Sequence, residues 1–282
     1  MRLHGHEILL SGIVGSTAYG LAAPGSDIDR LGIFVAPTSA FHGLHFPKET
    51  HAVQGPGMDD FTIHEARKWC KLALGCNPTV MELVWLPDEL IEVTSDWGEE
   101  LRSIRSCFLS ADRVRDAYLG YAFQQLKRLQ NRDDGTFGSD LRKRTAKHAR
   151  HLYRLCHQGL HLYRTGRLEI RLDPDAIMTA RAFGERVAAG DIPAAREMIK
   201  GFEQKFDAAR TPLGDRPDEE RVDRWLRAVR HAYWKESDDV HEVQRRDATH
   251  HAELLARRAR EGRAVDRGRY LPHAGSEGPS AA

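Results

Sequence analysis

The sequence has little of several features that would narrow its class at once. It holds only four cysteines, Cys70, Cys76, Cys107 and Cys156, in 282 residues, and their spacing is not that of a metal site. With no signal peptide in view, we expect reduced thiols and a cytoplasmic protein. No apolar run approaches the roughly 18 residues that a membrane-spanning helix needs, so we expect no membrane span.

An excess of charge of one sign is also missing. The net charge is +1, so the overall balance does not require a nucleic-acid partner, and any basic surface must be local. Hydrophobic residues make up 41% and charged residues 29%, which is typical of a globular protein with a real core. The length allows one large domain or two modest ones, and the sequence contains no internal repeat.

The most informative segment that is present runs from residue 8 to residue 35, ILLSGIVGSTAYGLAAPGSDIDRLGIFV. Its pattern predicts a strand, a glycine turn, the start of a helix near Thr17, a loop and a second strand. Gly15 has no side chain, so an anionic ligand can approach its backbone closely. We expect Ser16 to cap the helix and to offer its hydroxyl to a phosphate, which the helix N-terminus also favours.

Two aspartates stand at the start of the second strand. Asp27 and Asp29 are two positions apart, so on a strand their side chains point to the same face. Two adjacent carboxylates repel one another, and the pair therefore needs a cation between them or a proton on one of them. The simpler alternative is a capped helix followed by a loop whose aspartates are only solvated.

The string V-G-S, ten residues, then D-I-D resembles the signature of the DNA polymerase β nucleotidyltransferase superfamily. More narrowly, GSTAYGL with SDIDRLGIFV is similar to the nucleotidyltransferases associated with RNA repair and RNA ligases in bacteria and phages. The resemblance covers about thirty residues. It implies an α+β fold in which a small mixed sheet, similar to the polymerase β palm, is followed by helices.

A third carboxylate is expected from a neighbouring strand, because two-metal nucleotidyl transfer uses one to bind the metal of the attacking hydroxyl. The alternation from Asp60 to His64 predicts a half-buried strand that runs into a helix over 65–74. The resemblance supports Asp60, since the family has an aspartate just before such a strand and helix. Asp59, on the opposite face, remains the alternative, and so does a pair that merely ends a turn.

Beyond about Ser95 the pattern becomes helical. We expect a catalytic domain at 1–100, a helical domain at 101–260 and a disordered tail at 261–282. The predicted helices of the second half follow loops rich in turn-forming residues, such as the one at 131–140. We expect a cleft between the two halves.

The longest of these predicted helices spans 141–165 and carries a basic face. Lys147, His151 and Arg154 are separated by four and three positions, so they share that face. The string KHARHLYRL resembles the lysine-histidine helix that flanks the active site in the family, which implies contact with a triphosphate or an RNA backbone. The alternative is an ordinary solvated basic helix.

The hypothesis that follows is an enzyme that moves a nucleoside monophosphate from a nucleoside triphosphate to a hydroxyl and releases pyrophosphate. Asp27, Asp29 and Asp60 would hold two Mg²⁺ ions, or Mn²⁺, while Gly15 and Ser16 would hold the phosphates. The resemblance implies an RNA 3′ end as the acceptor and an RNA ligase or another RNA-repair protein as a partner.

Three other functions remain open from the sequence. Members of the same superfamily modify a protein hydroxyl or an antibiotic instead of RNA. A nucleotide-binding or RNA-binding module without catalysis is a second possibility, although binding alone does not need unshielded aspartates. A metal-free ribonuclease that uses Arg144 and His151 is a third.

Overall fold

The computed structural model describes residues 2–3, 6–23, 25–55, 58–130 and 139–234. The chain divides into two compact units, Met1–Trp234 and Lys235–Ala282, and every described residue belongs to the first. The predicted tail at 261–282 therefore lies outside the described residues, as does most of the predicted loop at 131–140.

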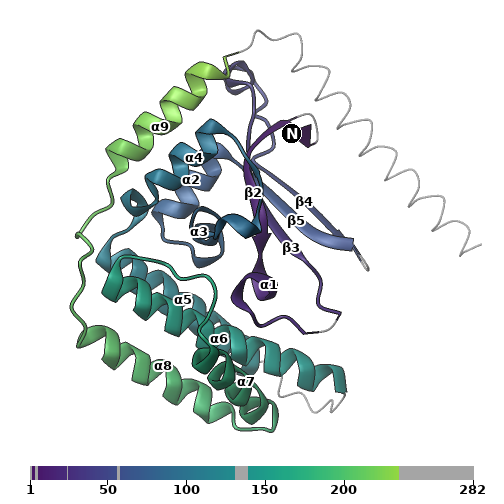
Figure 1. Cartoon of the computed structure of the whole chain (residues 1–282), viewed down its shortest axis with the longest axis vertical. Coiled ribbons are helices and arrows are strands. Elements are labelled where there is room, and N and C mark those ends of the chain that lie inside the picture. The colour runs from purple at the N-terminus through teal and green to yellow at the C-terminus, as the bar shows by residue number, and fades with distance from the viewer. Residues whose placement is uncertain (1, 4–5, 24, 56–57, 131–138, 235–282) are drawn as a thin grey trace, which may run out of the picture. The chain divides into compact units, whose positions relative to one another are not determined.

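One mixed sheet forms the first part of this unit (Figure 1). Its strands are β1 (Arg2–Leu3), β2 (His6–Val14), β3 (Asp29–Val35), β4 (Thr50–Gly55), β5 (Met58–Glu65) and β6 (Ile91–Thr94). The strand order is β1-β2-β3-β5-β4, and β6 also pairs with β2. The β3–β5 pair is parallel, whereas the other pairs are antiparallel. Parallel pairing places the starts of β3 and β5 at the same edge of the sheet.

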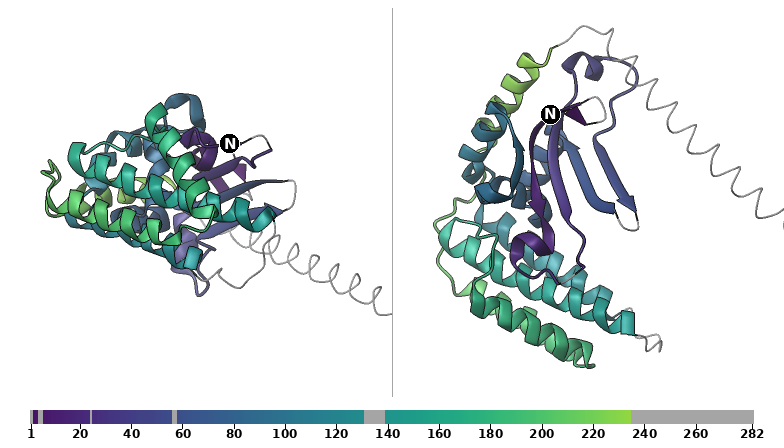
Figure 2. Two further views of the ribbon diagram at one scale, coloured as in Figure 1. Left: turned by 90° about the horizontal axis from the view of Figure 1, so that it is seen from below. Right: turned by 45° about the vertical axis from the view of Figure 1, so that its right-hand side comes forward.

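Short helices cover one face of the sheet (Figures 1 and 2). They are α2 (Ala66–Leu74), α3 (Pro78–Trp85) and α4 (Asp96–Ser103). Helix α1 (Gly15–Tyr19) follows directly from the end of β2, and the 3-10 turns are η1 (Thr38–His42), η2 (Asp88–Leu90) and η3 (Arg105–Phe108). Asn77 caps α3 by accepting hydrogen bonds from the Thr79 and Val80 amides, and Pro78 occupies the first helical position. Local capping chemistry therefore sets where α3 begins.

Longer helices form the second part. They are α5 (Ala111–Gln130), α6 (Ser139–Thr165), α7 (Pro174–Ala188) and α8 (Ile192–Asp207). Helix α6 packs against α5, α7 and α8. Leu152, Leu155 and Leu162 of α6 are fully buried. The predicted long helix is confirmed.

The last described helix, α9 (Glu219–Ala232), returns to the sheet part and packs against α2 and η3. Its buried stripe is Val222, Trp225 and Val229, which are three and four positions apart. The Trp225 indole donates a hydrogen bond to the Trp97 carbonyl at 3.2 Å. Strands and helices share one large hydrophobic core, and the predicted domain boundary near residue 100 stays a prediction.

The α+β class with a mixed sheet is confirmed. All four cysteines are free thiols, as expected. In the described part of the chain, no helix has both the length and the apolar character of a membrane-spanning segment. Strand β6 was not predicted, because it is only four residues long. Helix α4 begins at Asp96, where the sequence pattern becomes helical.

Candidate active site

Two neighbouring strands bring carboxylates together at one edge of the sheet. Asp29, the first residue of β3, lies directly opposite Asp60 of β5 in the parallel ladder. Asp27 precedes β3 by two residues and is exposed, so it stands on the loop and not on the strand as predicted. We call Asp27, Asp29 and Asp60 the acidic cluster. The side chain of Asp59, the alternative third carboxylate, lies outside the described part of the structure.

The charges of the acidic cluster affect one another. Partial burial raises the pKa of Asp29, and the nearby carboxylates of Asp60 and Asp27 raise it further. The Lys147 ammonium acts in the opposite direction and lowers the same pKa. Asp29 therefore lies where negative charge accumulates, and a cation bound there would relieve the repulsion.

The glycine turn lies against this cluster. Val14, the last residue of β2, pairs with Asp29, and Gly15 follows with a φ of +70°. A Cβ at Gly15 would overlap the Asp29 carboxylate and lie 2.8 Å from its Cγ. Only glycine suits both the left-handed conformation and the available space.

Ser16 does not have the predicted capping role. Helix α1 begins at Gly15, its N-cap is Val14, and no side chain caps it. Ser16 therefore lies inside the first turn, where its carbonyl accepts hydrogen bonds from the Gly20 and Leu21 amides. Because α1 begins at Gly15 and not near Thr17 as predicted, Ser16 is helical and cannot adopt the extended N-cap conformation.

The predicted basic face of α6 divides into residues with different environments. Lys147 is exposed and close enough to Asp29 to lower its pKa. The pKa of His151 lies well below its usual value because of burial and the adjacent Arg154 guanidinium, so this imidazole is neutral near pH 7. Of the three residues, the structure thus places only Lys147 as an exposed cation beside the acidic cluster.

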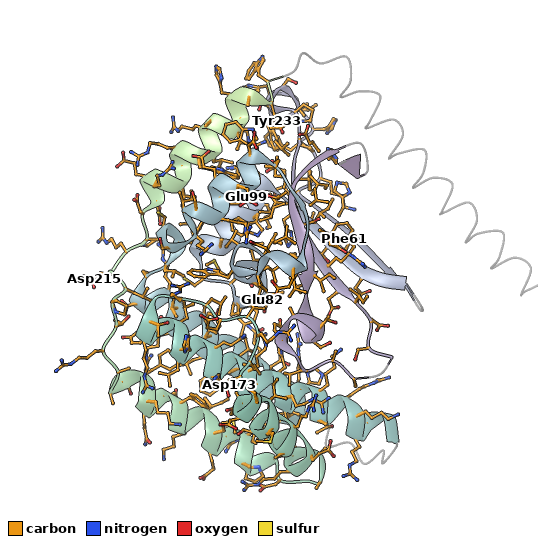
Figure 3. The ribbon with its side chains drawn as sticks, viewed as in Figure 1. Phe61, Glu82, Glu99, Asp173, Asp215 and Tyr233 are labelled. Carbon is orange, nitrogen blue, oxygen red and sulfur yellow. The ribbon has the colours of Figure 1, made fainter. Side chains whose placement is uncertain are left out.

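The prediction of an exposed basic face is wrong at Arg154. Its side chain is 1% exposed, and its guanidinium donates to the Glu82 carboxylate at 2.8 Å. It also donates to Gln158 at 2.7 Å and lies over the Tyr19 ring at 4.0 Å. A guanidinium so enclosed has no free face for a phosphate. We call Tyr19, Glu82, Arg154 and Gln158 the buried polar group; Figure 3 shows Glu82 between the sheet part and the long helices.

Tyr19 and Glu82 are buried polar residues that the sequence pattern did not predict as part of the site. Glu82 interrupts an otherwise apolar helix, Pro78–Trp85. A carboxylate inside such a helix is itself a signal, because a buried charge requires a partner. The partner could not be inferred, since Arg154 lies 72 residues further along the chain.

The acidic cluster suits a hard divalent cation, because carboxylate oxygens are the ligands that Mg²⁺ prefers. Among the residues that the structure describes, no three Asp, Glu, His or Cys side chains lie close enough together to hold one metal ion. Mg²⁺ is commonly bound by one or two carboxylates, with substrate phosphates and water as the remaining ligands. Adjacent Asp29 and Asp60 fit that mode of binding.

A small mixed sheet with a glycine turn and carboxylates on adjoining strands defines the class of DNA polymerase β-like nucleotidyltransferases. Within that class, the chain belongs to the RNA repair pathway DNA polymerase beta family (RlaP), whose family model matches residues 1–228. No curated protein matches the sequence.

One solved structure with similarity is the crystal structure of a nucleotidyltransferase-like protein from Exiguobacterium sibiricum 255-15. The two chains share 11% sequence identity, and the alignment covers 72% of this chain and 69% of the other. The TM-score is 0.28, so this likeness says nothing about substrate or mechanism.

Proposed function

We propose that the protein transfers a nucleoside monophosphate from a nucleoside triphosphate to the 3′ hydroxyl of an RNA, with release of pyrophosphate. The observation that carries this proposal is the pairing of Asp29 with Asp60 directly beside the Gly15 turn. The pairing collects negative charge where the divalent ions that accompany a triphosphate would supply positive charge. Membership in the RNA repair family supports RNA as the acceptor.

We assign the carboxylates of the acidic cluster different roles according to their positions. Asp29 and Asp60 are paired neighbours on adjacent parallel strands, and we assign them to the side of the attacking hydroxyl. Exposed Asp27 is assigned to the side of the triphosphate. When bound, two Mg²⁺ ions, or Mn²⁺, supply charge neutralisation and lower the pKa of the attacking hydroxyl.

The neighbouring groups bind and orient the nucleotide. Gly15 leaves the backbone of the turn open to phosphate oxygens, and Ser16 offers a hydroxyl from the first turn of α1. Lys147 contributes a positive charge next to Asp29. Positioning and charge stabilisation supply the rate in such a transfer, because the protein forms no covalent bond to the nucleotide.

The acceptor and the nucleotide are tested together. The protein is incubated with each of four labelled ribonucleoside triphosphates, with Mg²⁺ or Mn²⁺, and with RNAs that carry different 3′ ends. A parallel set replaces the RNA with cell protein. We expect label on RNA; label on protein instead would contradict the RNA acceptor and support the protein-modifying alternative.

A matched pair of variants tests the acidic cluster. Asp27→Asn should reduce transfer by roughly 100-fold or more, the scale seen when a group that stabilises transition-state charge is lost. Asp215→Asn is the control, since Asp215 is exposed in the loop before α9 and lies far from Glu82 in Figure 3. Circular dichroism confirms that both are folded. Full transfer by folded Asp27→Asn would overturn the proposed mechanism.

A further inference from the structure

Glu82 is the centre of the buried polar group and connects three elements. It lies on α3 with 1% exposure. The Tyr19 hydroxyl of α1 donates to its two carboxylate oxygens at 2.5 and 2.6 Å, and Arg154 of α6 donates to one of them at 2.8 Å. One carboxylate thus joins the short helix after the glycine turn to the longest helix of the structure.

The same carboxylate lies close to the turn. Burial raises the pKa of Glu82, and the Arg154 guanidinium, the Tyr19 hydroxyl and the nearby Gly15 backbone amide oppose that rise. Helix α1 begins at Gly15, which lies against Asp29, where a Cβ would overlap the carboxylate. Hydrogen bonds therefore link Arg154 to Glu82 and Glu82 to Tyr19, and α1 connects Tyr19 to the Gly15 turn beside Asp29.

The Arg154 guanidinium keeps its charge although it is buried. Burial by itself lowers the pKa of Arg154, but Tyr19 and Glu82 outweigh it and raise that pKa, so the guanidinium stays charged. The Gln158 amide beside it donates to the Glu169 and Ile170 carbonyls at 2.8 Å, which anchors the group to the segment after α6.

Stability alone does not explain such a pair. Removing a carboxylate and a guanidinium from water costs free energy that their attraction barely repays, and apolar side chains of similar volume are often as stabilising. An apolar pair cannot, however, accept the hydrogen bond that the Tyr19 hydroxyl of α1 donates to Glu82. What the ion pair adds is a directional contact to the short helix that begins at the Gly15 turn.

We propose that Glu82 and Arg154 are positioning residues of the nucleotide site. They hold α1, and with it the Gly15 turn, beside Asp29, and they fix α6, which carries Lys147, relative to that turn. This proposal rests on the proposed function for its kinetic consequence, but its structural consequence can be measured without nucleotide.

The first test is the double variant Glu82→Leu/Arg154→Met, which replaces the ion pair by apolar side chains and leaves no buried charge behind. Hydrogen exchange at the Gly15 amide is followed by NMR on protein labelled with ¹⁵N-glycine, without metal or nucleotide. We expect a folded variant in which Gly15 exchanges at least tenfold faster. A folded variant with unchanged Gly15 exchange overturns the proposal.

A milder pair of variants covers the case in which the double variant does not fold. Tyr19→Phe removes a donor to Glu82 but keeps the ring beneath Arg154. Tyr118→Phe is the control, since Tyr118 is also fully buried and its hydroxyl has no hydrogen-bond partner in the described structure. Faster Gly15 exchange in Tyr19→Phe alone supports the proposal, and equal exchange in both variants contradicts it.

Kinetics separate this proposal from the proposed function. In an active wild type, we expect the folded double variant to show a KM for the nucleotide raised about tenfold, with a smaller change in kcat. An unchanged KM together with unchanged Gly15 exchange overturns the positioning role. If the wild type transfers no nucleotide at all, the proposed function fails, whereas the exchange measurement still decides whether Glu82 and Arg154 hold the turn.

Discussion

Asp29 and Asp60 lie opposite one another on two parallel strands, and each strand begins at the same edge of the sheet. The two carboxylates come from segments about thirty residues apart, yet the ladder places them in register. Burial and its neighbours raise the pKa of Asp29, so the metal-free fold carries an electrostatic cost at this point. That cost should be measurable as a dependence of the protein's stability on pH.

The stability of the metal-free protein should depend on the charge of Asp29. Because the folded-state pKa of Asp29 is raised, the folded state binds its proton more tightly than the unfolded chain does. The associated stability is present at low pH and is lost as pH rises through the folded pKa. At neutral pH in chelator, Asp29→Asn should therefore be more stable than wild type by about 0.2–1 kcal/mol, as for partly solvated charges.

Thermal unfolding in chelator, measured from acid to neutral pH, checks this expectation. The advantage of Asp29→Asn should vanish at the acid end, where the wild-type carboxyl is protonated. The same variant should lose transfer activity by roughly 100-fold or more. An Asp29→Asn protein that is less stable than wild type at neutral pH would show that the carboxylate is not under electrostatic stress.

Gly15→Ala should weaken nucleotide binding by at least about tenfold, because the new Cβ would displace the Asp29 carboxylate. Its matched control is Gly166→Ala, which has the same φ of +70° but meets only ordinary contacts, at 3.6 Å, from Leu213 and Pro212. Both variants should lose about 1–2 kcal/mol of stability through left-handed backbone strain. Calorimetric titration with nucleotide and Mg²⁺ distinguishes them, and equal affinity in the two variants would argue against the close contact with Asp29.

Lys147→Ala should shift the pH dependence of transfer. The Lys147 ammonium lowers the pKa of Asp29, so its removal raises that pKa. Since the proposed reaction requires ionised Asp29, the acidic limb of the kcat/KM profile should move to higher pH. Lys200→Ala, on the exposed side of α8, serves as the control and should leave the limb in place. An acidic limb that stays at the same pH in Lys147→Ala would show that Lys147 does not act on Asp29.

Trp225→Ala should destabilise the whole first unit by about 3–5 kcal/mol, the usual cost of emptying a large buried aromatic site. The residue is 1% exposed and joins α9 to the sheet part through its bond to Trp97. Trp234→Ala is the control, because Trp234 is 57% exposed and its loss should cost about 0.5 kcal/mol. Urea unfolding measures both, and similar costs for the two variants would mean that α9 contributes little to the core.

Local spacing was sufficient to predict the parts of the site that lie close together in sequence. The sequence predicts the strand, turn and helix around Gly15 and the strand that carries Asp60, whereas Asp27 lies on the loop before β3 and not on the strand. These features depend on backbone conformation and on alternation along single elements, which neighbouring residues determine. The resemblance to a nucleotidyltransferase family rests on the same short strings, and the family match confirms it.

Tertiary packing alone decided what the long helix α6 presents to the site. Periodicity correctly grouped Lys147, His151 and Arg154, but it could not tell which end of that face meets solvent and which meets α3. Arg154 is enclosed because Glu82 and Tyr19, each more than sixty residues away from their partners, converge on it. A helical period specifies which side chains are neighbours on one element, whereas the partner of a buried charge is chosen by elements that meet only when the chain has folded.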